Sequence, residues 1–317
     1  MPDVPVLDHA AVLAAVSPEA AIDAVREAFV CHRRGEWVMP AKVYLPSPGY
    51  GDFRAMPARG DGLAMLKWIS SFPQNPAHGL PTVIGVVLLS DAETSELVLV
   101  LDAGAVTALR TGAVAAVASR ALAPEGASTA GVVGCGVNGA WAARCLRADG
   151  WVEGVVTDPR RTIAEALADE LGTRWRAGSL AEALAQDAVS CVTPGAVPVV
   201  TRADLRPGLH LNMLGADGPG KAEASVDAVA ACELFCDEWE QASHAGELTG
   251  AVEAGRVTRE RVSDLGAVLG GEHPGRSQVA ATTLFDSTGL AIQDLAIARV
   301  ALHAFRTGAI VAGSVRL

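Results

Sequence analysis

A glycine-rich hexapeptide at residues 134–139 constrains the fold of this chain more than any other stretch. It reads Gly-Cys-Gly-Val-Asn-Gly, follows the short apolar run 128–133 and precedes an alanine-rich segment, 140–146, with an apolar face. A strand, a tight turn and a helix in this order let a backbone approach a pyrophosphate, and the start of the helix offers it N–H groups. We therefore predict a dinucleotide site at this turn; a turn with a purely structural role is the alternative.

A second strand supports the same interpretation. Residues 154–157 form a short run rich in valine, and Asp158 follows them directly. A carboxylate at this position binds the ribose hydroxyls of the adenosine half and repels a 2′-phosphate, which favours NAD. Arg160 and Arg161 come next and could hold that phosphate instead, so NADP is the alternative. An ordinary turn at Asp158 is compatible with either cofactor.

The segments after this strand alternate between helix and strand patterns. Helices are predicted to begin at Thr162 and Ser179, because a glutamate stands three residues after each, in the spacing of a capping box. Apolar runs at 189–192, 209–214 and 233–236 predict further strands. Strands that alternate with helices favour an α/β fold with a doubly wound parallel sheet, the Rossmann architecture.

The first third of the chain has a different pattern, β-rich with one leading helix. Ser17 and Pro18 mark the start of that helix, and the run Arg33, Arg34, Gly35 marks its end. Alternating and apolar runs then predict short strands, at 39–46, 52–58, 64–72, 83–89 and 97–101.

Two domains follow from these patterns. A long helical pattern covers 103–123, and a last helix, 291–305, is apolar enough to pack on another domain, which we expect to be the first. We predict an α+β domain at 1–115 and 291–317, and a Rossmann domain at 116–290.

Composition limits the classes of function. The net charge of −11 over 317 residues leaves no basic stripe to neutralise nucleic-acid phosphates. No uninterrupted apolar run has the length of a membrane span, and the N-terminus has no basic region, so we expect a cytoplasmic protein. The six cysteines have no zinc-binding spacing, and we expect buried thiols and no metal site: Cys31, Cys135, Cys145, Cys191, Cys232 and Cys236.

The sequence allows two interpretations each for two charged residues, Lys67 and Asp217. Lys67 is the only charge in the apolar stretch 64–72, so its side chain either meets an anion or extends to the surface. Asp217 lies in the glycine-rich loop 215–223, directly after a predicted strand. Ligands bind at that end of a parallel sheet, although an aspartate among glycines can also be a plain turn residue.

Ordered motifs along nearly the whole chain resemble the ornithine cyclodeaminase/mu-crystallin family. They include Asp-Phe-Arg-Ala-Met-Pro, Leu-Lys-Trp, Leu-Arg-Thr-Gly-Ala and Leu-Phe-Asp-Ser-Thr-Gly, and lie at 52–57, 66–68, 75–82, 109–113, 134–139, 215–223 and 284–289. The resemblance implies a homodimer, with the α+β domain binding the substrate and forming the dimer, and the Rossmann domain binding NAD. Family members act on amino acids and their imines.

The resemblance also implies roles for single residues. Arg54, Lys67 and Arg110 would hold the substrate carboxylate, with Lys42 nearby, and Asp217 would be the acid/base group, with Lys67 as the alternative proton donor. The dinucleotide would be held by a larger set: Thr111, Gly134, Gly136, Val137, Asn138, Gly139, Asp158, Arg160, Thr193, Met213 and Ser287.

The branch within the family stays open. The stretch 237–248 is similar to alanine dehydrogenases and imine reductases, whereas 67–73 and 215–221 depart from the cyclodeaminase pattern. We therefore predict an NAD-dependent amino acid dehydrogenase or imine reductase acting on CH–NH2 or C=N groups, as in alanine dehydrogenase, ketimine reductase or iminosuccinate reductase. An ornithine- or lysine-type cyclodeaminase with recycled NAD and a mu-crystallin-like binding protein are the alternatives. Ser70 or Ser71 could accept the second carboxylate of a dicarboxylate substrate.

Overall fold

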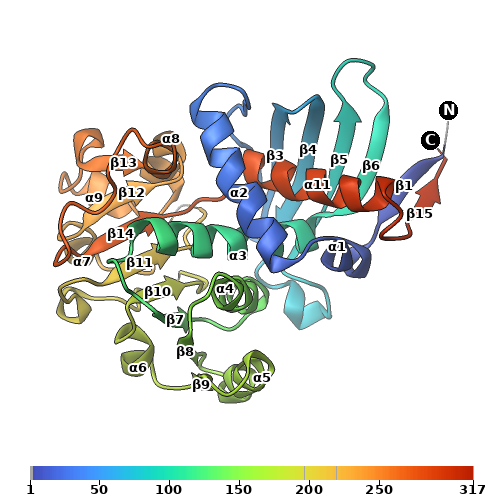
Figure 1. Cartoon of the computed structure of the whole chain (residues 1–317). Helices are drawn as coiled ribbons and strands as arrows, with labels where there is room; N and C mark the ends of the chain where they lie inside the picture. Colours follow the sequence, from blue (N-terminus) through green and yellow to red (C-terminus); the bar gives the residue numbers. More distant parts are fainter. Residues whose placement is uncertain (1–2, 196, 219, 317) are drawn as a thin grey trace. The chain divides into compact units, whose positions relative to one another are not determined.

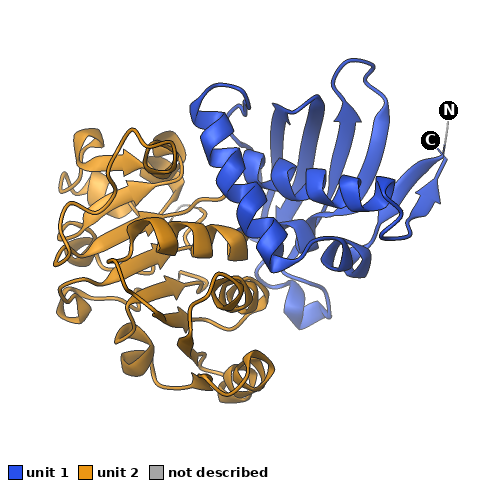
Figure 2. Cartoon of the chain, viewed as in Figure 1, with its two compact units in different colours: residues 1–110, 290–317 blue, residues 111–289 orange. Residues whose placement is uncertain are grey.

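A computed structural model describes residues 3–195, 197–218 and 220–316. The chain divides into two compact units, which Figure 2 colours separately. Unit 1 comprises residues 1–110 and 290–317, and unit 2 comprises 111–289. The sequence prediction had set the division at 115/116 and 290/291. Helix α3 (Ala103–Leu122) runs through the first division, so that Arg110 belongs to unit 1 and Thr111 to unit 2.

The described part of unit 1 contains a seven-stranded sheet in the order β15-β1-β6-β5-β4-β3-β2. Its strands β2 to β6 form antiparallel neighbours, and β1 pairs parallel to β6. The strands are β1 (Val4–Leu7), β2 (Val43–Ser47), β3 (Gly51–Gly60), β4 (Leu63–Ser71), β5 (Val83–Asp91), β6 (Leu97–Asp102) and β15 (Gly313–Val315).

Helices cover one face of this sheet. They are α1 (His9–Ala15), α2 (Pro18–Arg33) and α11 (Ala291–Arg306), and α11 packs on α2, β3 and β4 (Figure 1). Ser17 caps α2 by accepting a hydrogen bond from Ala20 N–H, as its sequence predicts. The last helix returns to the first unit, also as predicted. The prediction of one leading helix was wrong, because α1 precedes α2 under its own cap, Asp8.

Unit 2 contains an eight-stranded parallel sheet in its described residues, in the order β13-β12-β14-β11-β10-β7-β8-β9. The strands are β7 (Thr129–Val133), β8 (Glu153–Thr157), β9 (Trp175–Ala177), β10 (Ala188–Cys191), β11 (His210–Met213), β12 (Glu233–Cys236), β13 (Val262–Asp264) and β14 (Thr283–Asp286). The helices are α4 (Val137–Ala148), α5 (Arg161–Leu171), α6 (Leu180–Leu184), α7 (Val226–Val229), α8 (Trp239–Ala245), α9 (Thr249–Glu253) and α10 (Leu265–Leu269). The predicted α/β fold, with a doubly wound sheet in one unit and an α+β arrangement in the other, is confirmed.

One of the two predicted capping boxes is wrong. Ser179 and Glu182 exchange both hydrogen bonds at the start of α6. Helix α5 instead begins at Arg161, one residue before Thr162, and its N-cap residue makes no side-chain hydrogen bond. Glu165 does not reach back to the backbone, because its carboxylate pairs with Arg161 Nε at 2.7 Å. An ion pair across one helical turn thus replaces the predicted cap.

The cysteines follow the prediction with one exception. All six are free thiols, and five are buried, whereas Cys31 on α2 is half-buried. Burial raises the pKa of Cys135 to about 12, so this thiol beside the glycine-rich turn is uncharged at neutral pH.

Candidate active site

A group of cations lies on the helix-covered face of the unit 1 sheet. Lys67 on β4 is opposite Met56 on β3, and Arg54 on β3 is opposite Ile69 on β4. Antiparallel partners share a face and side chains alternate along a strand, so Lys67 and Arg54 point to the same side. Both are buried, Lys67 with an exposed fraction of 1%. The lysine therefore does not extend to the surface.

The anion that meets Lys67 is Asp294, in the first turn of α11. Its Oδ2 lies 2.6 Å from Lys67 Nζ, and its Oδ1 lies 3.7 Å from Nε of Arg110 on α3. Lys67 also donates to Thr107 Oγ1 at 3.4 Å. Within the described chain neither Asp294 oxygen has a hydrogen bond of good geometry, and neither does Arg110 Nε. Three elements thus bring two cations and one anion together, with hydrogen-bonding capacity left over.

The sequence analysis missed Asp294. Its signal was a single carboxylate among apolar residues: the run Ala291 to Ala298 is buried throughout, and only Gln293 and Asp294 in it are polar. A buried charge requires a partner, so this aspartate and Lys67 could have been matched as a pair.

The groups around Lys67 have opposing effects on its pKa. Burial lowers the pKa of Lys67 to about 8, the carboxylate of Asp294 raises it, and Arg110 and Arg54 lower it again. The lysine is therefore charged at neutral pH but titrates far below an exposed lysine.

The other predicted carboxylate-binding residues lie at the edge of the same sheet. Arg54 Nε is 2.5 Å from Asp52 Oδ1, and its guanidinium lies 5.3 Å from the centre of the Tyr44 ring. Lys42 directly precedes β2 and is half-buried. Ser71 lies on the Lys67 face, whereas Ser70 faces the other side and donates to Ile84 O. Of the two serines, Ser71 is the one near the cations.

The glycine-rich turn of unit 2 fits a pyrophosphate. Gly134 has φ +95°, a conformation that favours glycine, and a Cβ on Gly139 would lie 1.8 Å from Gly134 O. A Cβ on Gly136 would meet no atom within 4 Å, so open space lies above the turn. Gly136 is the N-cap of α4 and offers no side-chain acceptor to the first N–H groups of the helix. Phosphate oxygens can take that place.

Asp158 follows β8 beside this turn. It accepts hydrogen bonds from Cys135 N–H at 2.9 Å and from Arg160 Nε at 3.0 Å. Burial raises its pKa, but the bonds from Arg160 and Cys135 outweigh this effect and hold the pKa below its ordinary value. The Arg160 side chain is 64% exposed, so the arginine can leave the carboxylate at small cost.

The remaining predicted cofactor residues lie on the same edge of the unit 2 sheet or next to it. Thr193 follows β10, Met213 ends β11 and Ser287 follows β14, so all three stand at the carboxyl ends of neighbouring parallel strands. Val137 and Asn138 open α4. The order reverses between β7 and β10, the switch point where dinucleotides bind in such sheets.

Helix α3 packs closely against α4. A Cβ on Gly112 would lie 2.4 Å from Trp141 O, so only glycine permits this packing. The neighbouring Thr111 is buried, and its Oγ1 has no hydrogen-bond partner among the described residues. A buried hydroxyl without a partner is suited to a phosphate oxygen.

The loop that carries Asp217 is fixed by a buried glutamate. Glu223 accepts hydrogen bonds from Thr193, Leu214 and Gly215 N–H. Its own N–H donates to Glu247. Asp217 is 34% exposed and lies 2.6 Å from Lys221 Nζ. Pro219, within the predicted motif, lies outside the described residues.

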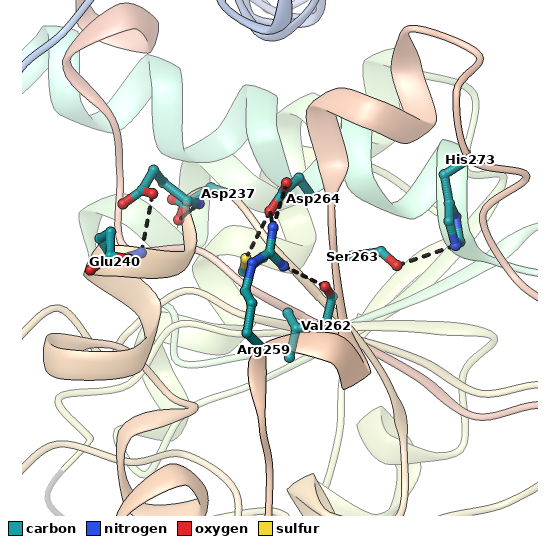
Figure 3. A network of polar contacts seen from close by, with 9 residues as sticks. Asp237, Glu240, Arg259, Val262, Ser263, Asp264 and His273 are labelled. Carbon is teal, nitrogen blue, oxygen red and sulfur yellow. Dashed lines mark hydrogen bonds and ion pairs between the residues drawn. The ribbon is translucent and has the colours of Figure 1, made fainter.

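A polar network supports the Ser287 segment. Asp237 accepts from the hydroxyls of Ser287 and Thr288 and from Gly289 N–H. Figure 3 shows Asp237 near the start of α8, and Arg259, which binds Asp264 with Nη2 at 2.8 Å. Asp237 thus links the segments that follow β12 and β14, and the second of these carries the predicted dinucleotide-binding residue Ser287.

Comparisons with known proteins agree with this geometry. The model of the ornithine cyclodeaminase/mu-crystallin family matches residues 4–308. An alanine dehydrogenase from Archaeoglobus fulgidus is 39% identical, over 90% of each chain. An iminosuccinate reductase from Paracoccus denitrificans is 31% identical, over 91% of this chain and 92% of the relative. A solved archaeal alanine dehydrogenase dimer with bound NAD superposes with a TM-score of 0.94 at 36% identity, covering 100% of both chains. Among the described residues, no helix has the length and apolarity needed to cross a membrane.

Proposed function

Because the chain belongs to the ornithine cyclodeaminase/mu-crystallin family, we propose that it is an NAD(H)-dependent oxidoreductase of the amino acid dehydrogenase and imine reductase type. It interconverts a small 2-imino acid, or a 2-oxo acid with ammonia, and the L-amino acid. The observation that carries the proposal is a group of three cations in unit 1: Lys67 and Arg54, which are buried, and Arg110, which is half-buried. Such a group suits a small carboxylate ligand.

In the proposed reaction these cations bind and orient the substrate carboxylate. Arginine can hold a carboxylate through two parallel hydrogen bonds, and Arg110 Nε has that capacity to spare. Lys67 adds a compact charge, and Lys42 is a further contact at the edge of the group. Burial strengthens these interactions, because little water competes for them.

The dinucleotide would be held by the glycine-rich turn, Thr111 and the edge that carries Thr193, Met213 and Ser287. When bound, it supplies or accepts the hydride at the substrate α carbon. Asp158 supports NAD, the cofactor in the solved alanine dehydrogenase dimer. Binding the ribose hydroxyls requires Arg160 to move from Asp158, and its exposure permits this.

Asp217 would be the acid/base group at the substrate nitrogen, so that the reduced species is an iminium ion rather than a neutral imine. Its ion pair with Lys221 and its partial exposure support a carboxylate that is charged and accessible. Lys67 is the alternative proton donor, because its pKa of about 8 lies near neutrality.

The open face of the unit 1 sheet supports a homodimer. The side of the sheet without helices carries apolar side chains, many of them exposed: Val43, Leu45, Phe53, Trp68, Ile84 and Val86. Phe53 and Trp68 stack with ring centres 5.6 Å apart. A second copy of this chain would cover this apolar face, as expected from the relative solved as a dimer. We propose that the protein is cytoplasmic, because all six cysteines are free thiols and thiols stay reduced in the cytoplasm.

The experiment that tests the function is a spectrophotometric assay of NADH consumption. Glyoxylate, pyruvate and oxaloacetate are offered with ammonia, cyclic imino acids are offered alone, and L-ornithine is offered with NAD. Stoichiometric loss of NADH on any reductive substrate supports the proposal, and repetition with NADPH tests the cofactor. Ammonia release and proline formation from ornithine without net change in NADH would instead show a cyclodeaminase. No turnover, with dinucleotide bound, would leave a binding protein.

A further inference from the structure

We propose that Asp294 is a positioning residue of the active site, which holds Lys67 charged and in place and aligns Arg110 for the substrate carboxylate. The inference rests on the proposed function, because it concerns the same substrate group. It assigns a role to a residue of α11 that joins two substrate-binding cations from different elements.

Geometry supports this role. Each oxygen of Asp294 faces a different cation, Oδ2 toward Lys67 Nζ at 2.6 Å and Oδ1 toward Arg110 Nε at 3.7 Å. Lys67 belongs to β4 and Arg110 to α3, so the carboxylate fixes two elements at once. Asp294 is fully buried and lies in the first turn of α11, where the helix dipole stabilises a negative charge.

Electrostatics explains why the anion is needed. The groups that face Lys67 are Asp294 from α11, Arg110 and Thr107 from α3, and Arg54 from β3, while its partner on β5 is Val87. Without Asp294, burial and two arginines would all favour neutral lysine. A neutral lysine would bind a carboxylate poorly. The aspartate thus keeps the lysine charged before the substrate arrives.

A structural ion pair is the competing explanation. Removing one partner of any buried pair leaves an uncompensated charge and destabilises a fold. A positioning role makes a second, separate claim: loss of the carboxylate must change the pH at which Lys67 loses its proton. The two explanations therefore differ in a pH dependence rather than in stability alone.

The test is kcat/KM of Asp294→Asn divided by that of the wild type, for the oxo acid used best, from pH 6 to pH 9. The ratio cancels the ionisation of ammonia and of the substrate. We expect it to fall as pH rises towards 8, by up to tenfold per pH unit, and then to level off, with the loss mainly in KM. A ratio that is constant with pH would overturn the proposal. Asp294→Glu keeps the charge and should give a constant ratio; a falling one also counts against it.

Asp61→Asn is the matched control. Asp61 pairs at 2.9 Å with Arg299, which lies on α11 as Asp294 does. Asp61 is exposed, however, and lies outside the cation group. Its conformation, φ 54°, is one that asparagine tolerates. This variant should keep a ratio near one at every pH.

A second readout needs no turnover. Burial lowers the pKa of Lys67 below that of the unfolded chain, so folding stability rises as pH passes upward through the folded pKa. In Asp294→Asn this rise begins at lower pH, and the deficit in thermal midpoint against the wild type must shrink as pH approaches 8. A deficit constant with pH contradicts the pairing. A shrinking deficit in a protein that reduces no imino acid would retain the pairing and reject the proposed function.

Discussion

Units 1 and 2 both bury carboxylates at the places where a ligand is expected, but they compensate them differently. In unit 1, Asp294 faces the cations Lys67 and Arg110 and retains unused hydrogen-bonding capacity. In unit 2, Glu247 accepts hydrogen bonds from two consecutive backbone N–H groups, those of residues 223 and 224, and Glu223 accepts three others. In unit 1 the buried carboxylate faces side-chain cations, and in unit 2 the buried carboxyl groups accept hydrogen bonds from the backbone.

At neutral pH the buried lysine of unit 1 is charged, whereas a buried glutamate of unit 2 is neutral. Lys67 has its pKa lowered to about 8 and stays charged, whereas burial raises the pKa of Glu247 to about 8 and keeps it neutral. Burial also raises the pKa of Glu223 and, well above its usual range, that of Asp286. A charged group can hold an anionic substrate. A neutral Glu247 can hold the backbone at residues 223 and 224 without repelling the phosphates of a dinucleotide.

The largest expected effect concerns the carboxylate that is not buried. If unit 2 uses its buried acids only to hold loops, the accessible Asp217 must do the proton transfer. Asp217→Asn should lower kcat about 1,000-fold, within the range of general acid–base catalysis, and leave NADH affinity unchanged. Turnover is followed by NADH absorbance, and NADH binding by fluorescence.

Lys221→Gln is the control for this substitution. Lys221 is the ion-pair partner of Asp217, at 2.6 Å. If the pair merely shapes the loop, both variants lose activity to the same extent, and Asp217 has no role of its own. A much smaller loss in Lys221→Gln assigns the proton transfer to the aspartate.

The next effect tests the unit 1 side of the comparison. Lys67→Met removes a charge that faces the substrate and should reduce kcat/KM for the oxo acid about 100-fold, mostly through KM, since charged hydrogen bonds contribute about 1.5–3 kcal/mol. NADH affinity, a property of unit 2, should not change. An unchanged KM would remove Lys67 from carboxylate binding.

Stability must be measured on the same variant. Asp294 left without Lys67 is a buried charge with one distant partner, and breaking a buried pair costs about 3–5 kcal/mol. The double variant Lys67→Met with Asp294→Leu removes both charges and should regain most of the lost thermal midpoint without regaining activity. Recovery of activity in the double variant would show that the single loss was only one of folding.

The sequence predicted the parts of both units that depend on local pattern. The glycine-rich turn, the strands of unit 2 and the Ser179 cap follow from residues within a few positions of one another. The Thr162 capping box had the right spacing but was wrong, because Arg161 competes for Glu165. Spacing alone does not say which partner a carboxylate takes.

The site was harder to predict, because its pairs are far apart in the chain. The sequence left open whether Lys67 meets an anion or extends to the surface. Its anion lies on the last helix, and only tertiary packing of α11 against β4 brings Asp294 to it. The Glu223 and Glu247 hydrogen bonds were likewise invisible, because their donors are backbone N–H groups that every sequence possesses.

A smaller effect tests whether unit 1 binds a second carboxylate of the substrate. Ser71 shares the face of Lys67, so Ser71→Ala should reduce kcat/KM for oxaloacetate about tenfold while pyruvate is unaffected, the loss of one hydrogen bond to a charged group. Ser70→Ala is the control, because Ser70 lies on the opposite face. An unchanged ratio of the two substrates in Ser71→Ala excludes this serine from specificity.

The last prediction tests whether Glu247, a buried acid of unit 2, is neutral. Since Glu247 has a pKa of about 8 when folded and an ordinary one when unfolded, the folded state holds a proton that the unfolded state loses between about pH 4.5 and 8, and wild-type stability falls over that range. Glu247→Gln has no such proton. It should match the wild type near pH 4.5 and gain stability over it by about 1.4 kcal/mol for each pH unit up to about pH 8, as seen in thermal midpoints across pH. Glu253→Gln, on the exposed side of α9, controls for the loss of one charge. If Glu247→Gln were less stable at pH 8 than at pH 4.5 relative to the wild type, the carboxylate would be ionised, and both units would balance charge in the same way.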